Sequence, residues 1–275
     1  MENIKIGLQL FSVRDKMAED MEGTLKAVKE MGYDCVEFAG YFDKSAEEIR
    51  SMLDNLGLEC ISVHQTPSLF IEEGQKAVDF LKVLGAKYAA VPWYGVEEFK
   101  NNWNNTMELF TKAGKLLADN GIQMLYHNHD FEFQKLGDEL IIDKLYSTMP
   151  EKYLQPEFDT CWIKYAGYDP LEYLKNYSGR INVVHLKDFY CKEFAAGPVY
   201  ALIDENGKES KAPTREERAF EFRPIGSGLQ DIKAICDASV KAGAHYLIVE
   251  QDDWYDKNSL ELAKQSCEYL KSIGY

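Results

Sequence analysis

The chain has 275 residues and a formal net charge of −15, with 45% hydrophobic and 13% aromatic residues. This apolar content is ample for a large core, which excludes a disordered chain. An acidic surface repels phosphate backbones and anionic headgroups, so we expect neither a nucleic-acid nor a membrane partner. The N-terminal segment has no basic stretch before a long apolar one, which predicts a cytoplasmic protein.

Eight short apolar runs alternate with amphipathic stretches and predict the strands. These runs are residues 4–10, 35–38, 60–64, 88–93, 123–129, 154–159, 182–187 and 246–251. Most of the intervening stretches end in Gly, as a helix C-cap does, and predict helices at 24–32, 45–57, 72–85, 106–121, 169–179, 231–243 and 259–274, with a weaker one at 138–149. Successive strands lie about 30 residues apart, which is the spacing of a parallel sheet with helical crossovers. The pattern predicts an α/β protein, a single (β/α)8 TIM barrel over residues 1–275.

Helix starts and cysteines add two smaller expectations. Ser45 and Asp169 are expected N-caps, and Pro170 suits a first helical turn because its missing N–H needs no partner there. The six cysteines are scattered without a C-x-x-C pair, so we expect reduced, packed thiols rather than a zinc ribbon or redox motif.

The step between the last two strands is irregular, because Val184 and Ile248 lie 64 residues apart. Residues 190–222 hold an ENGK turn and a charged run without a long helical pattern. We expect a hairpin-like insertion after the seventh strand that lies over the barrel mouth, where barrels place specificity elements. A solvated surface insertion is the alternative.

The five histidines are unevenly placed. Four of them fall at the carboxyl ends of predicted strands, and two further strands end in acidic residues: His64, His127, His129, His185, Asp159 and Glu250. Because the carboxyl ends of barrel strands converge on one mouth, this pattern predicts a metal-dependent active site. Carboxylates with one or two imidazoles suit a divalent ion with open positions, and Mn²⁺ is favoured over Mg²⁺, Co²⁺ or Zn²⁺.

Other polar side chains near the predicted mouth are candidates for substrate contacts. Glu37, His64 and Gln251 end strands and could bind hydroxyl groups, and Trp93 could form an apolar wall, with core packing as its alternative. Lys187 is predicted to point with His185 and to stabilise a substrate oxyanion, or else to be a solvent-exposed lysine.

The GSG sequence at residues 226–228 either brings backbone amides to an anion or forms a plain turn. Whether the substrate carries a phosphate group is therefore an open question at the level of the sequence.

Several segments resemble a known family over nearly the whole chain. The segments GLQLFSVRD, YHNHDFEF, EFDTCW, INVVHLKD, RPIGSG and YLIVEQDD are similar to the xylose isomerase-like TIM barrel superfamily, in its sugar phosphate isomerase/epimerase group. That group includes ketose 3-epimerases and inosose dehydratase. The resemblance implies that Asp159, His185 and Glu250 are metal ligands.

The chain departs from the ketose 3-epimerases on the fifth strand, where their first metal ligand is a Glu. His127 stands at about this position, which makes it the favoured fourth ligand or base. His129 and Glu132 are the alternatives, each also a candidate for substrate binding.

The resemblance implies a metal-dependent isomerase or epimerase of a keto-sugar or sugar phosphate. Such an enzyme removes a proton next to a carbonyl through a metal-stabilised enediolate, with His127 or Glu250 as the base and Lys187 holding the oxyanion. The alternative is a metal-dependent lyase or dehydratase on a keto-sugar, keto-glycoside or cyclitol, like inosose dehydratase.

Two further readings are disfavoured. DNA repair would need more histidine ligands and a basic groove, and a non-catalytic sugar-binding barrel would not need the acidic and histidine set. We expect a small sugar as the partner, and assembly into a homo-oligomer stays open.

Overall fold

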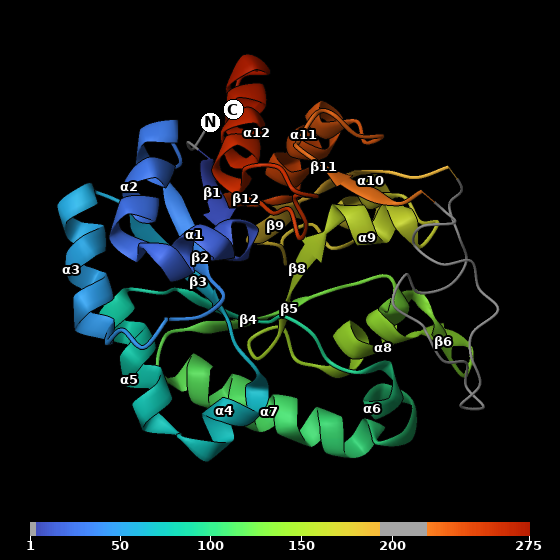
Figure 1. Ribbon diagram of the computed structural model, residues 1–275. Helices are drawn as coiled ribbons and strands as arrows, with labels where there is room; N and C mark the ends of the chain where they lie inside the picture. Colours follow the sequence, from blue (N-terminus) through green and yellow to red (C-terminus); the bar gives the residue numbers. More distant parts are fainter. Residues whose placement is uncertain (1–3, 193–218) are drawn as a thin grey trace.

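The structure is a computed structural model that describes residues 4–192 and 219–275. Eight parallel strands close into a barrel in the order β1-β12-β9-β8-β5-β4-β3-β2 (Figure 1). Their bounds are β1 Lys5–Gln9, β2 Cys35–Phe38, β3 Glu59–His64, β4 Tyr88–Val91, β5 Gln123–His127, β8 Gln155–Asp159, β9 Val183–Leu186 and β12 Tyr246–Val249. Each predicted strand is present, and the predicted (β/α)8 fold is confirmed.

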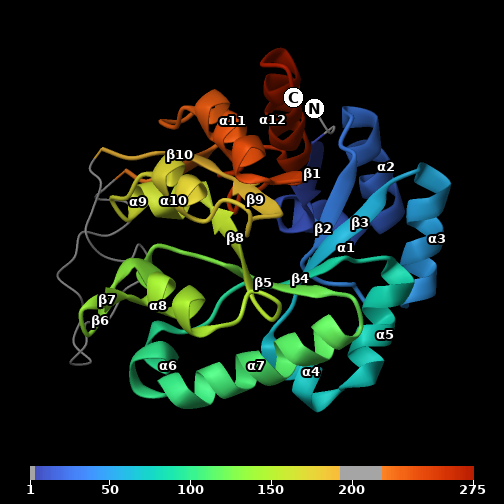
Figure 2. The ribbon, with the colours of Figure 1, turned by 180° about the vertical axis from the view of Figure 1, so that it is seen from behind.

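Helices surround the barrel, with α3 and α5 on one flank and α8 to α10 on the opposite flank (Figure 2). Their bounds are α1 Arg14–Glu19, α2 Met21–Met31, α3 Ala46–Leu56, α4 Pro67–Glu72, α5 Gln75–Leu84, α6 Val96–Asn101, α7 Trp103–Asp119, α8 Ile141–Thr148, α9 Thr160–Tyr165, α10 Pro170–Asn176, α11 Ile232–Ala242 and α12 Ser259–Ser272. The expected N-caps are confirmed, since Ser45 forms a capping box with Glu48 and the Asp169 side chain accepts from Leu171 N.

The helix expected over 72–85 is α5, which begins only at Gln75 because the backbone of Gly74 takes a positive φ of 55° and separates it from α4. Four short helices, α1, α4, α6 and α9, lie in the segments that follow strands and were not expected. A residue pair on each side of Gly137 also forms a small antiparallel hairpin of β6, Lys135–Leu136, and β7, Glu139–Leu140.

The expected insertion begins and ends in an antiparallel pair of short strands. These are β10, Asp188–Tyr190, and β11, Glu221–Arg223, with Asp188 opposite Arg223. Residues 193–218, which make up most of the expected insertion, lie outside the described residues. Its placement over the mouth stays a prediction.

The barrel interior has an apolar layer beneath a polar one. The apolar layer consists of buried residues from neighbouring strands: Cys35, Ile61, Ala90, Leu125, Val183, Tyr246 and Ile248. Side chains alternate along a strand, so the next inward positions of these strands lie one layer nearer the carboxyl ends. Strand register then pairs His127 with Glu157 and Asp159 with His185.

All six cysteines are buried, as expected for packed thiols. Within residues 4–192 and 219–275, no helix combines the length and the apolar character that crossing a membrane requires.

Candidate metal and active site

Four side chains at the carboxyl end of the barrel converge as a candidate metal site. They are His127, Asp159, His185 and Glu250, all of them buried, and one nitrogen or oxygen of each lies within 4.8 Å of the others. His185 Nδ1 lies 3.0 Å from Glu250 Oε2, and His127 Nε2 lies 3.5 Å from Asp159 Oδ2. The structure thus brings together residues from four strands that lie far apart in the sequence.

This donor set suits a divalent ion. Two carboxylates would balance a charge of +2, and the two imidazoles would supply the remaining ligands, leaving open positions for substrate oxygens. His185, whose pKa is raised in the metal-free protein, would lose a proton when the ion binds. Asp159 Oδ2 is buried and lies 2.9 Å from the Lys187 ammonium, so this oxygen already faces a positive charge and suits a cation. These four residues would hold the ion.

Lys187 is buried with a relative exposure of 1%, so it is not the solvent-exposed lysine of the alternative expectation. Its Nζ lies 2.9 Å from both Asp159 Oδ2 and Glu250 Oε2, and 3.1 Å from Asp252 Oδ1. Burial disfavours the charged form, but these carboxylates outweigh it and hold the pKa of Lys187 well above its usual value. The ammonium is therefore a permanent charge beside the candidate site.

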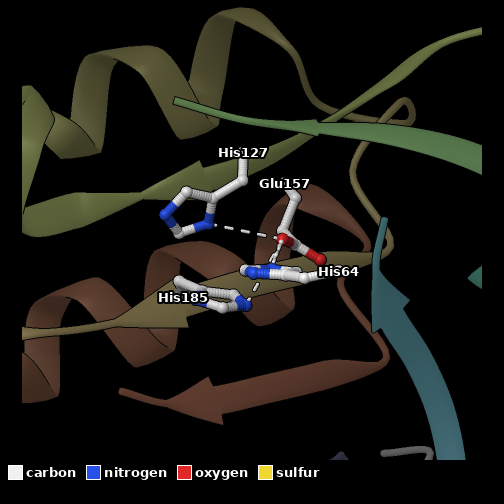
Figure 3. A group of neighbouring side chains, drawn as sticks. All are labelled: His64, His127, Glu157 and His185. Carbon is white, nitrogen blue, oxygen red and sulfur yellow. Dashed lines mark hydrogen bonds and ion pairs between the residues drawn. The ribbon is translucent and has the colours of Figure 1, made fainter. Parts of the chain in front are cut away.

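A second group shares His127 and His185 with the first and adds His64 and Glu157 (Figure 3). We call it the lower group because Glu157 precedes Asp159 on β8. Glu157 Oε2 lies 3.1 Å from His64 Nε2, 3.3 Å from His127 Nδ1 and 3.4 Å from His185 Nε2. Glu37 Oε1 lies 2.9 Å from the Nε2 atoms of both His64 and His185. Glu157 was not among the expected site residues, although its position two residues before Asp159 on β8 places it on the same face.

The carboxylates of this lower group differ in their pKa values. Burial opposes ionisation of Glu37, but His64 and His185 outweigh it and hold the pKa of Glu37 well below its usual value. Burial and the neighbouring Glu37 raise the pKa of Glu157 to about 7. One carboxylate is thus a constant negative charge, and the other shares a proton near neutral pH.

The histidines also differ in their pKa values. Burial disfavours the charged form of both His64 and His185, but Glu37 and Glu157 outweigh it, raising the pKa of His64 to about 10 and that of His185 well above its usual value. Burial and the charge of His185 lower the pKa of His127 well below its usual value. His127 is therefore a neutral imidazole, the form that a metal ligand or a base requires.

Three of the expected substrate-binding residues lie outside the central cluster. Glu132 accepts hydrogen bonds from Tyr126 Oη at 2.6 Å and from His129 N at 2.8 Å, which commits both of its oxygens to the loop after β5. The Gln251 side chain donates to Asp253 O, and Trp93 is 58% exposed, packed edge-to-face near Phe131. The contacts of Glu132 favour a role in holding His129.

His129 is half-buried next to His127, with ring centroids 5.3 Å apart, and its ring stacks on Phe131. Burial and the charge of Lys187 lower the pKa of His129 to about 3, so this ring is neutral. The ring of His129 also packs near that of Trp162, with centroids 5.6 Å apart.

The GSG loop holds a carboxylate of the chain itself. Asp188 accepts hydrogen bonds from Gly226 N at 3.0 Å, Gly228 N at 2.8 Å and Gln230 N at 3.3 Å. A side chain at Gly228 would collide with the Asp188 carboxylate, which explains the glycine. The amides that could have bound an external anion are therefore occupied.

Comparisons with known proteins agree with this architecture. The model of the xylose isomerase-like TIM barrel family matches residues 25–273, and the chain belongs to this family. An inosose dehydratase of Clostridium botulinum (strain Alaska E43 / Type E3) is 26% identical over 300 residues, covering 98% of this chain and 97% of that protein.

Two solved structures share the fold. A sugar phosphate isomerase/epimerase from Parabacteroides distasonis superimposes with a TM-score of 0.77 at 22% identity, over 99% of this chain and 95% of that one. The IolI protein, solved with a bound zinc atom, superimposes with a TM-score of 0.69 at 14% identity, over 98% of each chain. These structures show that the chain shares the fold of a protein named as a sugar phosphate isomerase/epimerase.

Proposed function

We propose that this protein is a divalent-metal-dependent isomerase or epimerase of a keto-sugar, which removes and returns a proton next to a carbonyl. The observation that carries the proposal is the convergence of His127, Asp159, His185 and Glu250 within 4.8 Å at the carboxyl end of the barrel. A bound divalent ion, with Mn²⁺ favoured, would supply Lewis-acid polarisation of the substrate oxygens.

The residues of the chain take distinct parts in this proposal. Burial disfavours ionisation of Glu250, but Lys187 and His185 outweigh it and hold its pKa below the usual value, so Glu250 is ionised and able to accept a proton at neutral pH. Lys187, 2.9 Å from Glu250, is close enough to stabilise negative charge on a substrate oxygen. His127 would complete the ligand set as a neutral imidazole, and the ring of His129 packs beside it.

The second candidate is a lyase or dehydratase that shares the deprotonation step and then expels a β-substituent. The observation in its favour is His127, which stands about where the ketose 3-epimerases have a carboxylate and makes the acid–base pair asymmetric. The similarity to inosose dehydratases over 98% of the chain supports the same alternative.

The substrate of either reaction is proposed to lack a phosphate at the GSG loop. Asp188 occupies the amides of Gly226 and Gly228, and the cationic Lys187 is already shared among three carboxylates. A neutral keto-sugar meets no such charge conflict.

A panel of keto-sugars and keto-cyclitols incubated with Mn²⁺-loaded protein in D₂O tests the proposal. Deuterium uptake with the carbon skeleton intact supports isomerisation or epimerisation, and uptake with loss of water or another leaving group supports elimination. Absence of both for every compound, in a protein that binds no divalent ion, would refute the proposed function.

A further inference from the structure

The two histidines of the candidate metal site each face carboxylates on both sides of the ring. His185 places Nδ1 3.0 Å from Glu250 Oε2 and Nε2 2.9 Å from Glu37 Oε1. His127 places Nε2 3.5 Å from Asp159 Oδ2 and Nδ1 3.3 Å from Glu157 Oε2. In both rings, one nitrogen therefore faces the metal-site carboxylates and the other faces the lower pair.

We propose that Glu37 and Glu157 are positioning residues for the metal site. Glu37 Oε1 lies at hydrogen-bond distance from His185 Nε2, and Glu157 Oε2 faces His127 Nδ1 at 3.3 Å. With an ion bound, each carboxylate would accept the N–H of its ring and so hold the tautomer that leaves the other nitrogen for the ion. A neutral imidazole carries one N–H and one lone pair, and a fixed acceptor for the N–H decides which nitrogen is left to bind metal.

His64 holds the two acceptors together. Its Nε2 lies 2.9 Å from Glu37 Oε1 and 3.1 Å from Glu157 Oε2, and its side chain is 8% exposed. Two buried carboxylates that face the same nitrogen repel one another unless a donor lies between them. Gln9 adds a hydrogen bond of 2.6 Å from Nε2 to Glu37 Oε1, which fixes this carboxylate from the β1 side.

A second metal ion in the lower group is the competing interpretation, because His64, His127, Glu157 and His185 also have donor atoms within 4.8 Å of one another. Two ions at once would require His127 and His185 to bind through both ring nitrogens and to lose both N–H protons. A neutral ring has only one free lone pair, so the geometry favours a hydrogen-bonding role for the lower group.

The inference rests on the metal site of the proposed function and is tested by metal binding rather than by activity. We expect Glu37→Gln and Glu157→Gln each to weaken Zn²⁺ or Mn²⁺ binding about 10- to 100-fold by competition with a chelator. Glu37→Asp, which keeps the charge, should recover part of the affinity. The control is Glu59→Gln on the same barrel, because Glu59 pairs with Lys5 at the opposite end of β3 and should leave the affinity unchanged.

The ring tautomers give a readout that a merely structural role would not change. In ¹⁵N-histidine-labelled, Zn²⁺-loaded protein, long-range ¹H–¹⁵N spectra should show His185 protonated at Nε2 and His127 at Nδ1. This measurement needs only the wild-type chain and decides the question even if a variant does not fold.

Opposite tautomers, unchanged affinity in both glutamine variants, or two ions per wild-type chain would each overturn the inference. A wild-type chain that binds no divalent ion would instead refute the proposed function.

Discussion

Lys187 and Asp159 form a fully buried ion pair, with Nζ 2.9 Å from Oδ2, in the position where a metal ion would meet the same carboxylate oxygen. The ammonium and a divalent ion would thus compete for the negative charge of the same carboxylate. Metal binding and the contact of Lys187 with Asp159 must therefore be coupled.

Replacement of Lys187 tests this coupling. We expect Lys187→Met, which keeps the length of the side chain, to destabilise the metal-free protein by about 3–5 kcal/mol because buried carboxylates lose their cation. Metal affinity should be at least that of the wild type, and activity should fall about 10²-fold or more. Chemical unfolding with and without Mn²⁺ measures the first two effects, and equal destabilisation in both states would contradict the coupling.

Asp159→Asn is expected to remove bound metal and to lower activity about 10³-fold or more, because an amide cannot balance the charge of the ion. The same result is expected for His185→Ala and Glu250→Ala, since these residues lie at the end of the barrel that serves function more than stability. Metal analysis of the purified variants tests this prediction, and full metal occupancy in all three would refute the proposed metal site.

His127→Glu restores the carboxylate of the ketose 3-epimerases on β5. We expect the variant to keep its metal and to shift the reaction toward simple C–H exchange if elimination is the native reaction. The ratio of deuterium uptake to leaving-group release gives the answer. His127→Ala serves as the comparison. If that variant keeps the metal content and the rate of the wild type, His127 is not the fourth metal ligand.

The metal-free protein should lose stability as the pH rises. The folded pKa of His64 is raised to about 10 from an unfolded value of about 6.5. A raised pKa contributes stability that is complete below the unfolded value and is lost as the pH passes through the folded value. Denaturant unfolding of chelator-treated protein between pH 7 and pH 10 should show this decline, and His64→Gln should flatten it. An equal slope in the variant would assign the decline to other groups.

Asp188→Ala should destabilise the chain by about 2–4 kcal/mol, because the amides of the GSG loop would lose a buried charged acceptor. Inorganic phosphate should then bind at the vacated amides and recover part of the stability, an effect that the wild type does not show. Thermal unfolding with phosphate, and with chloride at equal ionic strength, separates specific binding from a general salt effect. A variant that phosphate does not stabilise would contradict the anion-binding geometry of this loop.

The barrel could be predicted because each parallel strand is a short apolar run, and the ends of those runs named His127, Asp159, His185 and Glu250 directly. The sequence was less informative about Gln251. It follows Glu250 immediately, so strand alternation turns it away from the interior.

Contacts between side chains and distant backbone groups could not be predicted from sequence patterns. Glu132 lies three residues beyond His129, and only the three-dimensional structure shows that its carboxylate is committed to Tyr126 and the His129 amide. The hydrogen bonds from the GSG amides to Asp188 could not be predicted either, because the two segments lie about 40 residues apart in the chain.

Lys187 and Asp188 are consecutive residues that extend into different environments: the ammonium joins the interior carboxylates, and the neighbouring carboxylate anchors the loop that leads to α11. A single peptide unit thus connects the candidate site to the GSG loop. Any force that displaces the GSG loop reaches the lysine through one covalent linkage, without an intervening chain of packed side chains. The mouth of this barrel and its periphery are mechanically joined at that point.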